Sequence, residues 1–116
     1  MAFRFEDLQV WQKAIDLGEQ INQLTKEFPK EEVYILTSQI KRSADSVVLN
    51  IAEGSTGQTK AVFKVFLSYA LRSAIEVVSC LFIAKKRKYI EDAQFDVLYK
   101  EYETLVKMIT ALKNSF

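Results

Sequence analysis

Apolar residues recur every three or four positions along most of the chain, which is the spacing of one face of an α-helix. One such segment covers residues 8–28 and a second covers residues 29–53. A third follows the loop at residues 55–58, and a fourth begins near Glu91 or Asp92. The repeating apolar positions are Val10, Ala14, Leu17, Ile21, Leu24 and Phe28; Val33, Leu36, Ile40, Ala44, Val47 and Ile51; Phe63, Phe66, Ala70, Ser73, Val77, Cys80 and Ala84; and Phe95, Leu98, Tyr102, Leu105, Ile109, Leu112 and Phe116.

Few residues interrupt this pattern, since the 116 residues include three glycines and one proline. Pro29 disfavours simple continuation of the first helix and suits the first turn of the next one. Gly54 is expected to end the second helix as a left-handed residue past its C-terminus. Four long segments with short connections predict an all-α, up-down-up-down four-helix bundle, with residues 1–116 forming one domain.

Two segments carry more apolar surface than one bundle core requires. The third segment has a second apolar stripe, formed by Leu67, Leu71, Ile75, Val78 and Phe82. The first segment has extra apolar residues beside its main face, namely Leu8, Trp11 and Ile15. A helix that is apolar on two sides is usually buried on both, which favours association of subunits. A thick core with wide apolar faces explains the same pattern, so the sequence leaves both interpretations open.

Cysteine content and apolar run lengths indicate a cytoplasmic protein. Cys80 is the single cysteine, so no disulfide within the chain is expected. The first residues include acids where a signal peptide needs an apolar run. The most apolar stretch, residues 62–83, is interrupted by Lys64, Arg72 and Glu76, and we therefore expect no membrane span.

The sequence contains no histidine, which removes histidine-based nucleophile arrangements and the usual zinc and di-iron ligand sets. The glycines lack the Gly-Lys-Ser/Thr ending of a phosphate-binding loop. We therefore expect no catalytic residue, no metal site, no cofactor and no enzymatic activity.

Two acidic residues on the central helices, Glu53 and Glu76, are interpreted as structural. Glu76 lies four residues after Arg72, within reach of an ion pair on one helix, or it accepts a hydrogen bond from a neighbouring helix. Glu53 lies at a helix C-terminus, where a negative charge is disfavoured, so a cation such as Arg42 or Arg72 is expected beside it.

Charge is unevenly distributed along the chain. Residues 37–88 carry nine basic and three acidic side chains, whereas residues 1–36 carry four and seven, and residues 89–116 carry three and five. Such a basic segment is either a solvated helix surface or a site for nucleic-acid phosphates. The candidate nucleic-acid-binding residues are Lys41, Arg42, Lys60, Lys64, Arg72, Lys85, Lys86, Arg87 and Lys88.

Several segments together resemble a known family. They are FEDLQVWQKA at residues 5–14, FP at 28–29, LTSQIKRSA at 36–44, NIAEG at 50–54 and FLSYA at 66–70, followed by Ser73 and Glu76. In this order they resemble the four-helix bundle proteins encoded within intervening sequences of bacterial 23S ribosomal RNA genes. Asn50, Glu53, Gly54 and Glu76 belong to the structural motif of this resemblance. The chain departs from the family pattern at Ile35, Asp45 and Val48-Leu49.

The resemblance implies a left-handed bundle that assembles into a homopentameric ring. Relatives are often labelled ribosomal proteins, and they include an accessory protein of diversity-generating retroelements that binds nucleic acid and a reverse transcriptase. We therefore expect a non-catalytic oligomer that binds RNA or DNA through basic residues of its second and third helices. The alternative is a protein-interaction scaffold that docks a partner enzyme such as a reverse transcriptase.

Overall fold

A computed structural model describes residues 2–57 and 59–116 of the protein. Four α-helices account for most of these residues, and two short 3₁₀ turns, η1 and η2, precede α1 and α2. The elements are η1 (Arg4–Asp7), α1 (Gln9–Thr25), η2 (Lys30–Glu32), α2 (Leu36–Gly54), α3 (Lys60–Lys86) and α4 (Asp92–Asn114). The described residues include no strand, which confirms the all-α prediction. Of the predicted loop at 55–58, residue 58 lies outside the described residues.

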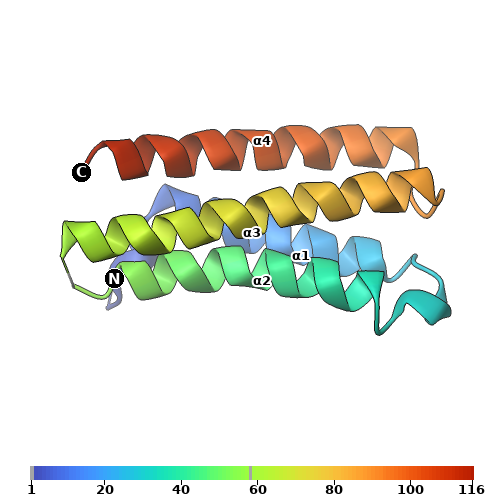
Figure 1. Ribbon diagram of the computed structural model, residues 1–116, viewed down its shortest axis with the longest axis horizontal. Helices are drawn as coiled ribbons and strands as arrows, with labels where there is room; N and C mark the ends of the chain where they lie inside the picture. The colour runs from blue at the N-terminus through green and yellow to red at the C-terminus, as the bar shows by residue number, and fades with distance from the viewer. Residues whose placement is uncertain (1, 58) are drawn as a thin grey trace.

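The four helices lie side by side along the long axis of a molecule measuring 43 × 23 × 23 Å, and the connections alternate between its two ends (Figure 1). Each helix packs against the next one in sequence, and α4 packs back against α1. The α2–α3 contact is the most extensive and the α1–α4 contact is the least extensive. This difference leaves the α1–α4 side more open than the others.

The buried core agrees closely with the predicted stripes of the first and last segments. All six repeating positions of residues 10–28 are buried, and those of α4 are buried from Phe95 to Ile109. Leu112 and Phe116, at the end of the stripe, are partly buried. Because four helices each bury one such stripe, the interior is almost wholly aliphatic and aromatic.

The second helix begins later than predicted. It starts at Leu36 rather than at Pro29, because η2 and a bend at Ile35 (φ −121°, ψ −99°) interrupt the helical path. Val33, predicted in the core stripe, is consequently 47 % exposed. The apolar spacing across residues 29–36 was therefore a wrong indication of continuous helix.

The third helix buries a different set of residues from the predicted stripe. Its core comprises Phe63, Leu67, Ala70, Ala74, Val77, Cys80, Leu81 and Ala84. Leu67, predicted on the second stripe, is fully buried, whereas Phe66 and Ser73 of the predicted core stripe are only partly buried. The predicted and the observed stripes share Phe63, Ala70, Val77 and Ala84, and they differ in the position between these residues. Both sets are spaced alternately by three and four residues, so spacing alone does not distinguish them.

Gly54 ends α2 but does not have the predicted left-handed conformation. The glycine with positive φ among the described residues is Gly57, at 86°. A Cβ atom on Gly54 would lie 2.7 Å from Cβ of Phe66 and 2.8 Å from Cδ1 of Phe63. Glycine is therefore required here because α3 approaches the end of α2 too closely for a side chain.

We predict that Gly54→Ala lowers the free energy of unfolding by about 1–3 kcal/mol, because the added methyl group forces apart well-packed aromatic rings. Urea denaturation measures the change. Gly18→Ala is the matched control, since its Cβ would meet only Cγ2 of Val48 at 4.0 Å. That substitution should stabilise the protein by about 0.5–1 kcal/mol through helix propensity. Equal effects of the two substitutions would contradict this account of Gly54.

Candidate functional site

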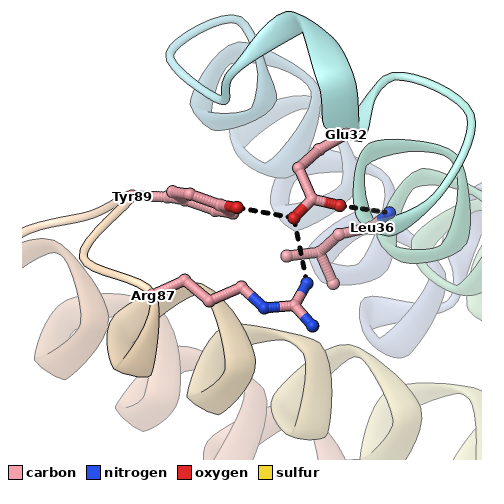
Figure 2. Close-up of polar contacts among 4 residues, drawn as sticks. All are labelled: Glu32, Leu36, Arg87 and Tyr89. Carbon is pink, nitrogen blue, oxygen red and sulfur yellow. Dashed lines mark hydrogen bonds and ion pairs between the residues drawn. The ribbon is translucent and has the colours of Figure 1, made fainter.

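A buried carboxylate joins the two connections at one end of the bundle. Glu32 of η2 is 6 % exposed, and its Oε2 atom accepts hydrogen bonds from the Tyr89 hydroxyl at 2.6 Å and from Nη1 of Arg87 at 2.9 Å (Figure 2). Its Oε1 atom accepts from the Leu36 backbone N–H at 3.4 Å. Glu32 therefore links the start of α2 to the α3–α4 connection, and we call Glu32, Leu36, Arg87 and Tyr89 the Glu32 cluster.

These contacts keep Glu32 ionised. The Tyr89 hydroxyl contributes most to lowering the pKa of Glu32, and the Leu36 N–H and Arg87 lower it further, while burial opposes them. The same hydrogen bond raises the pKa of Tyr89. Both oxygens of the carboxylate are already occupied by donors of this chain, so the cluster is arranged for holding the bundle end together.

The nine predicted basic residues are spread along α2, α3 and the connection that follows α3, rather than gathered at one point. Lys60 and Lys86 begin and end α3, which at 1.5 Å per residue separates them by about 39 Å. Two hydrogen bonds between helices, Ser73 to Ser46 and Gln39 to Glu76, fix the register between them. This register places Arg42 and Arg72 on adjoining turns of α2 and α3.

Several of these cations already have contacts within the chain. Arg87 pairs with Glu32, Nζ of Lys85 lies 4.3 Å from the centre of the Phe95 ring, and Arg42 donates to Oγ of Ser38 at 3.3 Å. Lys41 lines a groove between α1 and α2. Among the nine, the side chains that form no ion pair, cation–π contact or side-chain hydrogen bond with the described residues are Lys41, Lys60, Lys64, Arg72, Lys86 and Lys88.

The residues of the predicted structural motif lie on α2 and α3, and Gly54 and Glu76 directly meet residues of the other helix. Nδ2 of Asn50 donates to the carbonyl and hydroxyl oxygens of Ser46, whose hydroxyl accepts from Ser73 at 2.9 Å. Glu76 accepts a hydrogen bond from Gln39, in place of an ion pair with Arg72. Glu53 is exposed and, within residues 2–57 and 59–116, forms no ion pair with Arg42 or Arg72.

Two surface features are apolar: the first includes residues of the second stripe predicted for α3, and the second was not located from the sequence. Large apolar side chains of α3 face outward, among them Ile75 at 60 % and Phe82 at 51 % exposure. A groove of about 560 Å³ lies between α1 and α4. In the described part of the chain, α3 is long and apolar enough to span a membrane by composition, although a third of its most apolar stretch is buried against the bundle. The core helix of a soluble protein passes the same test.

No group of three or more potential metal ligands occurs among the described side chains. Cys80 is buried in the core, and burial together with the nearby Glu76 charge raises the pKa of its thiol. The cysteine therefore packs as a small apolar residue.

Comparison with known families places these observations in context. Residues 6–111 match the family model described as 23S rRNA-intervening sequence protein. The chain belongs to this family. The resemblance inferred from the NIAEG and neighbouring segments is thereby confirmed.

A solved structure has the same fold as this member of the 23S rRNA-intervening sequence family. It is a protein of unknown function from the S23 ribosomal protein family of Bacteroides thetaiotaomicron, 25 % identical to this chain, with a TM-score of 0.83. The alignment covers 90 % of this chain and 97 % of the Bacteroides protein. A comparison with curated proteins gives no match.

We predict that Glu32→Gln lowers the melting temperature at neutral pH, because the charged acceptor of Tyr89 and Arg87 is lost. Since the folded-state pKa of Glu32 is lowered, its stabilisation is complete above the ordinary carboxyl range and is lost as pH falls through the folded pKa. Thermal melts of parent and variant should therefore converge in acid. Glu31→Gln, at an exposed neighbouring position, is the control. A difference between parent and Glu32→Gln that does not change with pH would contradict the prediction.

Whereas Glu32→Gln should destabilise the protein, removing the hydroxyl of Tyr102 in the core should not. Its hydroxyl is buried and has no hydrogen-bond partner among the described residues, and burial raises its pKa. Removing an unpaired buried hydroxyl relieves a desolvation cost, so Tyr102→Phe should leave stability unchanged or raise it by about 1 kcal/mol. Denaturant titration tests this, with Tyr89→Phe expected to destabilise. Loss of stability in Tyr102→Phe would indicate a partner such as an ordered water.

Proposed function

We propose that this protein is a non-catalytic, cytoplasmic, oligomeric bundle that binds RNA or DNA through basic residues of α2 and α3. Its subunit is an up-down-up-down, left-handed bundle, and the assembly is a homopentameric ring, as the family resemblance implies. The observation that supports nucleic-acid binding most directly is the position of Arg42 and Arg72 on adjoining exposed turns. Two guanidinium groups on one face suit phosphate oxygens.

Charge is distributed among the helices in a way that favours this face. Helix α3 carries five basic side chains and one acidic one, whereas α1 and α4 each carry more acidic than basic side chains. Such an arrangement attracts a polyanion to α3 and repels it from the α1–α4 side. Contacts to phosphate need no base-specific geometry, so we expect little preference for sequence or for RNA over DNA.

A second candidate function is a protein-interaction scaffold that docks a partner enzyme such as a reverse transcriptase. The exposed apolar residues of α3 support it, since single-subunit proteins rarely expose a row of large apolar side chains. The two functions differ in their response to salt. Phosphate contacts weaken steeply as salt rises, whereas apolar docking does not.

We predict that the parent binds mixed-sequence RNA and DNA at about 50 mM salt and loses affinity steeply towards about 200 mM. Substituting Lys60, Arg42 and Arg72 with glutamine should weaken the binding of both RNA and DNA. It should also reduce the slope of log affinity against log salt concentration by about one for each lost phosphate contact. Fluorescence anisotropy with labelled strands measures both quantities.

The matched control substitutes Lys100, Lys107 and Lys113 of α4 with glutamine, which removes the same charge from another helix. This variant should keep most of the parent's affinity. If the two triple variants behave alike, the attraction comes from overall charge and not from the α2–α3 face. If the parent binds neither RNA nor DNA at about 50 mM salt, the nucleic-acid proposal is wrong and the scaffold function is favoured.

A further inference from the structure

A ridge of apolar side chains projects from α3 on the side nearer α4. Ile75 and Phe82 are more than half exposed, and Leu71 and Val78, on the intervening turns, are partly buried. The Phe82 ring packs edge-on against Phe95, with ring centres 4.8 Å apart. We call Leu71, Ile75, Val78 and Phe82 the α3 ridge. Phe82, the largest of these residues, is held by aromatic contacts, so little side-chain entropy would be lost if a partner covered it.

The α1–α4 groove has the opposite shape. Leu24, Ala93, Val97 and Leu98 provide its apolar surface, and Val97 is 59 % exposed. The groove is open because α1 and α4 are the least closely packed of the neighbouring helices. Its volume of about 560 Å³ is sufficient for several large side chains.

The charges beside the two surfaces are also opposite. Lys86 lies one turn beyond Phe82 on α3, and Glu19 and Glu27 line the groove. Glu19 accepts hydrogen bonds from Gln23 and Asn22, and Glu27 accepts one from Gln94 across the groove. These bonds hold the carboxylates in place, and they lower the pKa of Glu19.

We propose that the α3 ridge of one copy of this chain inserts into the α1–α4 groove of a second copy, with Phe82 as the anchor against Val97. The inference rests on the proposed oligomer and assigns the two surfaces that form it. Within one chain the ridge and the groove cannot meet, because the groove lies between α1 and α4 while the ridge belongs to α3.

Different surfaces of the two copies meet in this contact, so the interface is heterologous. Each copy offers one ridge and one groove, and the contact therefore repeats from subunit to subunit until a ring closes. Lys41 and Arg42, the basic residues of α2, stay outside the contact and remain accessible to phosphate.

The test uses the full chain with Phe82→Glu or Val97→Glu, each of which puts a charge on an exposed position of one surface. Sedimentation should show the parent as an oligomer and each variant as a monomer of 13.4 kDa. Leu49→Glu is the matched control, because Leu49 is 60 % exposed on α2, away from both surfaces, and this variant should stay oligomeric.

Mixing the two monomeric variants gives the decisive result. Phe82→Glu retains an intact groove and Val97→Glu retains an intact ridge, so a mixture should form a one-to-one dimer that cannot extend. A mixture that stays monomeric overturns the proposal, because it would place both residues in some other contact. The proposed contact is also overturned if Phe82→Glu and Val97→Glu remain oligomeric, or if Leu49→Glu becomes monomeric. Either result would still be compatible with the proposed oligomer. A monomeric parent at micromolar concentration instead rejects the proposed oligomer.

Discussion

The close approach of α2 and α3 is the constraint on which the rest of the structure depends. Small residues permit it: Gly54 accepts the rings of Phe63 and Phe66, and Ala70 and Ala74 are fully buried on α3. With small side chains facing inward, α3 lies against α2 along most of its length. The large side chains of the same helix, such as Ile75 and Phe82, consequently face outward. The packing of one helix pair thus creates the apolar surface that we assign to self-association.

A second constraint acts at the end of the bundle that holds the α1–α2 and α3–α4 connections, where the chain is not in regular helices. The linker between α1 and α2 contains a proline, a 3₁₀ turn and a bend, and its backbone needs partners from elsewhere. Glu32 provides them by joining the Leu36 N–H to Arg87 and Tyr89, 55 and 57 residues away. An ionised acceptor is effective in this place because three donors converge on it.

The sequence predicted what depends on regular spacing and missed what depends on contacts between distant residues. The stripes of α1 and α4 identified nearly all buried positions, since each helix follows one period without interruption. In α3 the period was right, but the positions between Phe63, Ala70 and Val77 were assigned one residue too early, so Leu67 was placed on the second stripe and not on the core stripe. The basic residues were identified by type alone, and the sequence could not show that Arg87 pairs with Glu32 while Arg72 forms no ion pair with the described residues. No local signal marks such a pairing, because the partners are brought together only by the folded bundle.

The position of α3 in the bundle explains how one helix can support two kinds of contact. Its residues near α4 are apolar, and its residues near α2 bring Arg72 beside Arg42. A ring built through the ridge would use the first set and repeat the second once in every subunit. Weak phosphate contacts repeated on one assembly add in free energy as long as a single strand can reach them together. Two cations per subunit, insufficient for tight binding by a lone bundle, would then be adequate for a ring. In this proposal, assembly and nucleic-acid binding are coupled through geometry, without any change in the fold of the subunit.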